Sequence, residues 1–154
     1  MTQRNNVVEL PNEILLKEVG RLVSEGRVVT LRVRGVSMRP FLEDRRDKIV
    51  LTSPGTAKVG DAVLAEIAPG KYVFHRIIQV EGERVILKGD GNVYGTEQCE
   101  LQNIVAATKG FIRKGRHYSP EGIAWRWYSA LWPDNVVVRR VLLAVHRRLP
   151  KNWR

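Results

Sequence analysis

The chain has 154 residues, of which 44% are hydrophobic and 27% are charged, as in an ordinary soluble globular protein of one domain. Its single cysteine, Cys99, excludes a disulfide framework, a zinc ribbon and an iron–sulfur site, because each needs several thiolates. No stretch of about 18 uncharged apolar residues is present, which excludes a membrane-spanning helix. Acidic residues interrupt the apolar part of the N-terminus, so no signal peptide is predicted. We expect a cytoplasmic or peripherally membrane-associated protein without a metal or cofactor.

The net charge of +10 is spread unevenly along the chain. Residues 1–108 hold 15 Lys/Arg and 14 Asp/Glu, whereas residues 109–154 hold 11 Lys/Arg and two acids, a local net charge of +9. A basic block of this kind suggests an anionic partner, either lipid or nucleic acid. The alternative interpretation is that the charge only keeps the tail soluble, and charge alone does not decide between them.

The first two thirds of the chain predict one helix followed by short strands. Residues 12–25 read as a helix that Asn12 can cap, with apolar residues on one stripe. Alternating apolar residues predict strands over 28–34, 48–51, 61–67, 71–80, 84–88 and 104–112. Gly- and Pro-rich turns separate these strands, and no long helix lies between them, so antiparallel pairing is expected. The prediction is a mainly β fold, a folded antiparallel sheet or partial barrel.

The last segment predicts an amphipathic basic helix within residues 136–149, flanked by tryptophans. Two sets of side chains fall on different faces of it: Val138, Val141, Leu142, Val145 and Leu149 on one, and Arg140, Arg147 and Arg148 on the other. Such a helix either packs onto the domain or lies at a membrane interface. We divide the chain into an N-terminal helical segment (1–27), a core (28–115) and a basic aromatic tail (116–154).

Three short segments contain the residue types of a serine nucleophile system. Ser37, His75 and Asp90 lie in the segments RGVSMRP, FHRII and KGDGN. A serine hydroxyl needs a base within hydrogen-bond reach, and histidine has a suitable pKa at neutral pH. An acid behind the histidine would fix its tautomer and stabilise the imidazolium. Spacing alone does not show that the three meet in space.

The order of these segments resembles the S24/S26 serine peptidases, a superfamily that includes signal peptidases and self-cleaving repressors of the LexA type. The matching motifs are Gly-x-Ser-Met-x-Pro, His-Arg and Gly-Asp-x-Asn, and residues 47–50 and 59–63 resemble the strand segments that follow the nucleophile. The resemblance covers about residues 28–112. It implies a LexA- or signal-peptidase-like β core and a serine endopeptidase active in proteolysis.

The resemblance also implies roles for individual residues. Ser37 would be the nucleophile and His75 the base, as in the Ser-His branch of the superfamily, with Asp90 assisting. The backbone amides of Ser37 and Met38 would hold the oxyanion, while Gly35 and Pro40 would lie on the substrate-binding side.

Two departures from the family pattern matter. The archaeal-type pattern has a second Asp about six residues after the Gly-Asp-Asn acid, where this chain has Thr96 and Glu97. The orienting acid is therefore either Asp90 or Glu97. Only about 27 residues precede the first predicted strand, enough for one helix but not for a helix-turn-helix domain, so no DNA-binding domain is evident.

The sequence therefore predicts a hydrolase that resembles signal peptidases and cleaves a peptide or preprotein with a Ser-His dyad or triad. An extended substrate would add as a strand beside the site. A preference for small residues near the cut is implied by the resemblance. The alternative is a non-catalytic binding module of the same fold, which docks on anionic lipid or nucleic acid through its basic tail.

Overall fold

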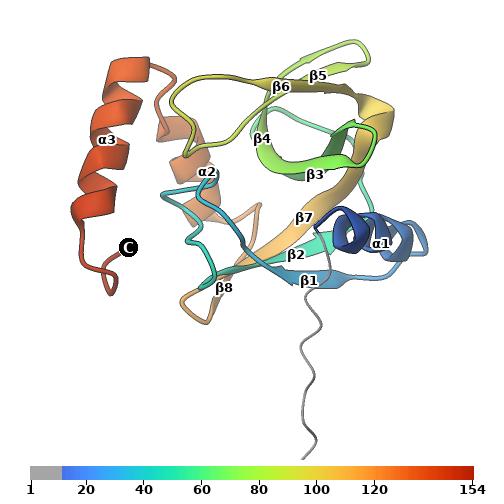
Figure 1. The fold of residues 1–154 in the computed structure, drawn as a ribbon, viewed down its shortest axis with the longest axis horizontal. Coiled ribbons are helices and arrows are strands. Elements are labelled where there is room, and N and C mark those ends of the chain that lie inside the picture. The colour runs from blue at the N-terminus through green and yellow to red at the C-terminus, as the bar shows by residue number, and fades with distance from the viewer. Residues whose placement is uncertain (1–11) are drawn as a thin grey trace, which may run out of the picture.

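A computed structural model describes residues 12–154 of the chain. The described residues form three α-helices and an eight-stranded sheet (Figure 1). In chain order the elements are α1 (Asn12–Ser24), β1 (Val29–Arg32), β2 (Lys48–Thr52), β3 (Ala62–Ala68), β4 (Lys71–Glu81), β5 (Arg84–Lys88), β6 (Glu97–Glu100), the 3-10 turn η1 (Leu101–Asn103), β7 (Ile104–Arg113), β8 (Arg116–Tyr118), α2 (Ile123–Leu131) and α3 (Val136–Arg148).

The strands form one antiparallel sheet with the order β1-β2-β7-β3-β4-β5-β6, and β8 pairs with β7. This confirms the predicted mainly β class with an N-terminal helix and a C-terminal basic helix. The short strands β6 and β8 and the helix α2 were not among the expected elements. Within residues 12–154, no helix has the length and apolarity needed to cross a bilayer.

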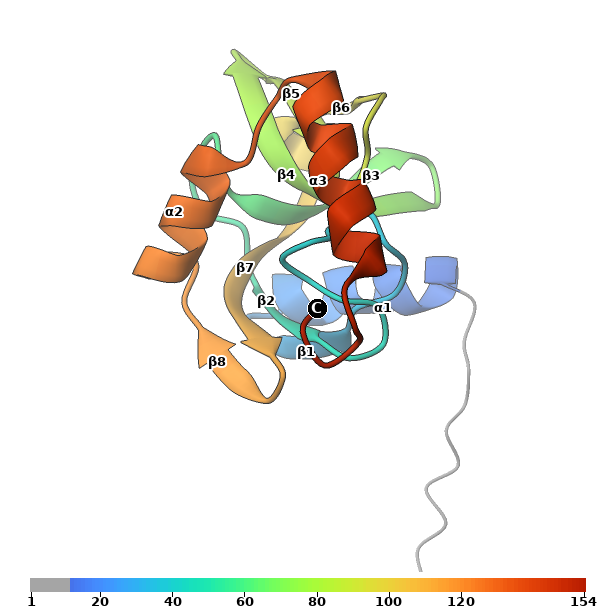
Figure 2. The same ribbon diagram turned by 90° about the vertical axis from the view of Figure 1, so that its left-hand side faces the viewer.

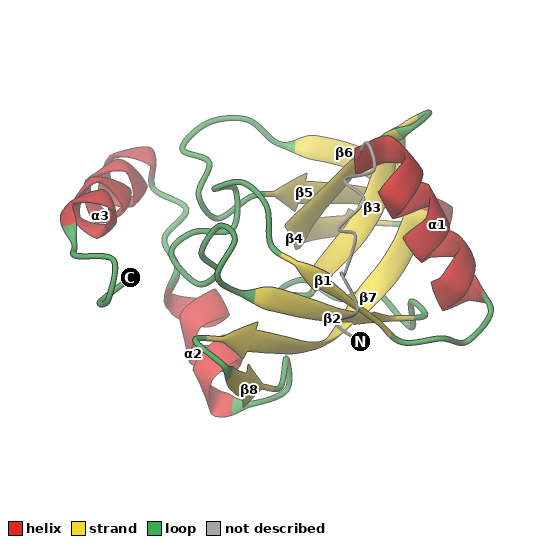
Figure 3. Cartoon of the chain, turned by 60° about the horizontal axis from the view of Figure 1, so that its bottom comes forward, coloured by secondary structure: helices red, strands yellow, loops and turns green. Residues whose placement is uncertain are grey.

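The helices lie at opposite ends of the sheet, with α1 at one end and α2 and α3 at the other (Figure 3). Helix α1 packs through Val19 and Val23, which are 2% and 0% exposed. Helix α2 buries Trp125, whose ring centroid lies 4.9 Å from that of Phe41 and 4.6 Å from that of Phe111. Full burial of one such side chain stabilises a fold by about 1.5–3 kcal/mol, so α2 is part of the hydrophobic core.

Candidate active site

Ser37 lies in a loop that leaves β1 and returns to β2. The loop is closed at its base by the N–H of Val33, which donates to the Asp47 carbonyl at 2.8 Å. Gly35 has a φ of 86°, a conformation that favours glycine, and its N–H donates to Asp44 Oδ1 at 2.8 Å. These contacts hold the turn, while the Ser37 side chain stays partly exposed.

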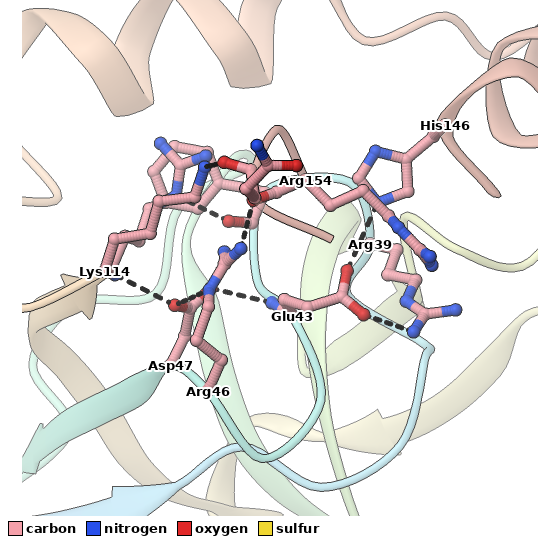
Figure 4. Close-up of polar contacts among 10 residues, drawn as sticks. Arg39, Glu43, Arg46, Asp47, Lys114, His146 and Arg154 are labelled. Carbon is pink, nitrogen blue, oxygen red and sulfur yellow. Dashed lines mark hydrogen bonds and ion pairs between the residues drawn. The ribbon is translucent and has the colours of Figure 1, made fainter. Parts of the chain in front are cut away.

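Asp47 supports this loop from below, as Figure 4 shows. Its fully buried carboxylate accepts hydrogen bonds from the N–H of Glu43 (2.8 Å) and of Lys114 (3.1 Å) and pairs with the Arg46 guanidinium at 2.7 Å. Burial alone would raise the pKa of Asp47, but Arg46 and the two N–H groups outweigh it and lower the pKa. The loop that carries the serine is therefore tied to β7 and β8 through a charged aspartate.

His75 lies in the middle of β4, opposite Val63 of β3, and is 5% exposed. Its Nδ1 lies 2.9 Å from Oε2 of Glu97, the first residue of β6. Its Nε2 faces Gly89, where an added Cβ would lie 3.0 Å from Nε2 and 2.6 Å from the Ser37 carbonyl oxygen. Only glycine allows the histidine ring and the main chain of Ser37 to lie side by side at this point.

The turn after β5 holds the same main chain from the other side. The N–H of Gly91 donates to the Ser37 carbonyl at 2.7 Å, and the N–H of Asn92 closes the turn on the Gly89 carbonyl at 3.0 Å. Three segments that lie far apart in the sequence therefore meet around the main chain of Ser37. The part of the chain that the structure describes contains no hydrogen bond between the Ser37 hydroxyl and His75.

Asp90 lies in the same turn but faces a different side chain. One carboxylate oxygen accepts from Arg76 Nε at 2.9 Å, and the other accepts from the Tyr128 hydroxyl at 2.7 Å. Burial raises the pKa of this 1% exposed carboxyl, although Arg76 and Tyr128 act in the opposite direction. Of the two acids that the sequence left open, Glu97 contacts the histidine, and Asp90 joins β4 to α2.

Two residues of the C-terminal region bind the glycine-rich turn at residues 89–92. The sequence did not predict this role. Trp132 Nε1 donates to the Asp90 carbonyl at 3.1 Å, and the Arg139 guanidinium donates to the Asn92 carbonyl at 3.0 Å. Arg139 is fully buried. One signal in the sequence could have identified it, because Arg139 shares a helical face with Leu143 and His146 at spacings of four and seven residues.

A cavity of about 330 Å³ opens beside Ser37 between α1, β1 and β4. Apolar side chains make up much of its wall, among them Leu16, Leu31, Met38, Leu64 and Phe74. Gly35 lines this cavity. Pro40 is partly buried after a cis peptide bond and is not among the lining residues.

Comparison with known proteins identifies one family. The profile of the Peptidase S24-like family matches residues 2–108, which include the serine loop, both acids and His75. The match ends before α2 and α3 begin. A search of curated proteins found no match to this chain.

Proposed function

The chain belongs to the Peptidase S24-like family, and from this premise we propose that it is a serine endopeptidase. Ser37 is the nucleophile, His75 the general base and Glu97 the acid that orients the base. The observation that carries this proposal is the position of the imidazole, with Nδ1 at 2.9 Å from the Glu97 carboxylate and Nε2 facing the Ser37 main chain across Gly89.

The proposed chemistry follows from this arrangement. When Nδ1–H donates to Glu97, the proton is fixed on that nitrogen and Nε2 carries the lone pair. Nε2 takes the proton of the Ser37 hydroxyl as its oxygen attacks the substrate carbonyl carbon, and later returns it to the leaving amine. Water then cleaves the acyl-enzyme ester by the same steps. Catalytic hydrogen bonds are commonly long in substrate-free sites and shorten when substrate binds.

The oxyanion would be held by the backbone N–H groups of Ser37 and Met38. The Gly91 N–H that binds the Ser37 carbonyl at 2.7 Å keeps this turn from relaxing, and Met38 is 3% exposed within the core. Donors that are fixed in advance need no reorganisation when charge develops on the substrate oxygen.

The site suits an extended peptide with an apolar side chain near the cut. β1 is an edge strand that leads directly toward Ser37, so a peptide can add beside it. The 330 Å³ cavity next to Ser37 would receive a side chain of that peptide. Its apolar wall and volume favour an aliphatic residue, either small or branched.

A serine-reactive fluorophosphonate probe tests the proposal on the full chain. We expect saturable labelling that peptide mapping assigns to Ser37, with loss of labelling in Ser37→Ala and strong reduction in His75→Ala. Members of one catalytic unit fail together, so both variants should also lose cleavage of apolar test peptides. Ser24→Ala, at the exposed end of α1, is the matched control and should behave like the unchanged chain. Labelling of Ser37→Ala at the normal rate would exclude this mechanism.

A further inference from the structure

Helix α3 presents its apolar side to solvent and its polar side to the protein. The buried residues of this helix are Arg139, Leu143 and His146, which are 0%, 6% and 8% exposed. The opposite face carries exposed valines, with Val137 at 67%, Val138 at 47%, Val141 at 55% and Val145 at 50% exposed. We call these four valines the outer face of α3. A helix that packs on a core normally buries such a stripe.

Polar contacts hold α3 in this orientation. Inside the fold, Arg139 Nε donates to the Pro133 carbonyl at 2.9 Å. His146 Nε2 lies 3.3 Å from Glu43 Oε2, and Glu43 also pairs with Arg39 of the serine loop, as Figure 4 shows. Rotating the helix to bury the valines would separate Arg139 from the Asn92 carbonyl and His146 from Glu43, and the loss of partners is costly for a buried charged group such as Arg139. The outer face is therefore a stable feature.

The chain end beyond α3 is fastened as well. Arg46 donates to the backbone carbonyl of Arg154, and Lys114 Nζ donates to the Asn152 carbonyl at 2.9 Å (Figure 4). Between these two anchored residues, Trp153 is 73% exposed. Figure 2 shows α3 in front of the rest of the molecule, and Figure 1 shows it at the outer edge, apart from the sheet.

The charges on α3 itself have one sign. Helix α3 contains no acidic residue, and Arg140, Arg147, Arg148 and Lys151 are all exposed on it or just after it. From this combination we propose that the outer face of α3 docks on an anionic lipid surface, with the valines and Trp153 in the headgroup region and the cations against the phosphates. Apolar burial and electrostatic attraction are the two contributions that hold such helices at membranes.

The same features disfavour other occupants. A second copy would bring two regions of +9 together, and nucleic acid would leave the valines without an apolar partner. The cation side of α3 also forms a cavity of about 280 Å³ with Val36, the neighbour of Ser37, and with Tyr94. Docking through the outer face therefore places the serine loop behind α3, about one helix diameter of 10–12 Å from the lipid. On the proposed function, this favours peptide substrates at the membrane surface.

Co-sedimentation of the full chain with vesicles tests the docking proposal independently of catalysis. The vesicles are phosphatidylglycerol and phosphatidylcholine in equal parts, compared with phosphatidylcholine alone. We expect binding only to the anionic vesicles. Arg147→Gln with Arg148→Gln should weaken it about 25-fold, since each cation near such a surface contributes roughly fivefold. The control pair Arg27→Gln with Lys71→Gln removes the same charge elsewhere and should have a much smaller effect.

A second variant tests the apolar part. Val137→Gln, Val141→Gln and Val145→Gln together keep the charge and use a better helix former at exposed positions, so folding should be retained. We expect at least tenfold weaker binding and loss of the fraction that resists high salt. The control Val59→Gln changes a valine that is 63% exposed and lies outside α3, in the loop between β2 and β3.

Four outcomes would overturn the proposal. One is absence of binding to anionic vesicles at low ionic strength, and another is binding that the triple valine variant leaves unchanged. The third is that the valine substitutions abolish a concentration-dependent dimer, which would assign α3 to a second copy. The fourth is that duplex DNA binds more tightly than the vesicles, which would assign α3 to nucleic acid. Cleavage of soluble test peptides should be unaffected by the valine variant, so failure of docking and failure of the proposed catalysis are separable.

Discussion

His75 and Arg76 are neighbours in β4, yet their side chains enter two different regions of the molecule. Successive side chains of a strand point to opposite faces, and each of these two meets one carboxylate. His75 meets Glu97 with side chains that are 6% and 27% exposed, whereas Arg76 meets Asp90 with side chains that are 6% and 1% exposed. The first pair retains access to water and faces the serine loop, while the second is sealed inside the protein.

The two carboxylates also differ in how many segments they join. Asp90 and its turn bind Arg76 of β4, Tyr128 of α2 and Trp132 beyond it. Within the candidate active site, Glu97 contacts His75. The comparison indicates that the Asp90 region maintains the fold and the Glu97 region supports the proposed chemistry, although both acids lie near the same loop.

Asp90→Asn should have the largest effect, and the effect should be on stability. Removing one partner of a buried ion pair leaves the other charge uncompensated, at a cost of about 3–5 kcal/mol in the free energy of unfolding. Urea unfolding followed by circular dichroism measures it. Asp134→Asn is the control, because that side chain is 91% exposed although it faces the buried Arg139 at 3.6 Å. We expect it to cost less than about 1 kcal/mol. Equal losses of unfolding free energy in Asp90→Asn and Asp134→Asn would contradict the structural role of the buried Asp90 pair.

Glu97→Gln should have the opposite profile, with activity reduced and stability kept. The amide can still contact the ring but does not stabilise an imidazolium, so we expect kcat to fall about 100-fold with KM nearly unchanged. A loss of kcat at unchanged KM is the readout that a purely structural role would not give. Glu100→Gln, on the exposed side of the same strand, is the control. The kcat of properly folded Asp90→Asn protein should fall less than that of Glu97→Gln. The reverse order would contradict this role for Glu97.

The sequence predicted the fold well where the signal is local. Periodicity located α1 and six strands to within one or two residues, and the motif order identified the segments that meet around Ser37. It failed for α2, which spans Ile123–Leu131 and owes its position to the burial of Trp125 against Phe41 and Phe111. Such long-range packing is not visible in a local pattern.

Long-range contacts also decide two further features that the local pattern did not show: which acid contacts His75, and which face of α3 is buried. Asp90 lies in the glycine-rich motif, but the turn aims it at Arg76, and the short strand β6 brings Glu97 to His75 instead. In α3 the helix was predicted correctly, yet which face is buried depends on partners of Arg139 that lie nearly 50 residues away in the chain.

Tyr128→Phe tests the buried region with a smaller change. Burial and the neighbouring Asp90 raise the pKa of Tyr128 well above its ordinary value, so the phenol stays a hydrogen-bond donor. Loss of its 2.7 Å bond to Asp90 should lower the free energy of unfolding by about 1.5–3 kcal/mol, as for hydrogen bonds to charged groups. Tyr94→Phe, at a 64% exposed position, should be neutral. Peptide cleavage by the folded Tyr128→Phe chain should be unchanged. A large loss of kcat would show that the Asp90 region also supports catalysis.

The smallest expected effect is the pH dependence of the Asp90 contribution to stability. Because burial raises the pKa of Asp90, the folded state binds its proton more tightly than the unfolded chain does. Stability from this group is then greatest below the ordinary Asp pKa of about 3.9 and declines as the pH rises to the elevated native value. The difference in unfolding free energy between the unchanged chain and Asp90→Asn should therefore shrink from acid to neutral pH.

Asp47 provides the control of opposite sign for this measurement. Its pKa is lowered in the folded protein, mainly because Arg46 and two backbone N–H groups outweigh burial. Its contribution is complete above the unfolded pKa and is lost as the pH falls toward the lowered native value. The difference between the unchanged chain and Asp47→Asn should therefore grow from acid to neutral pH. If the Asp90 difference also grows from acid to neutral pH, Arg76 and Tyr128 lower the pKa of Asp90 by more than burial raises it. The ionised form of Asp90 then stabilises the fold.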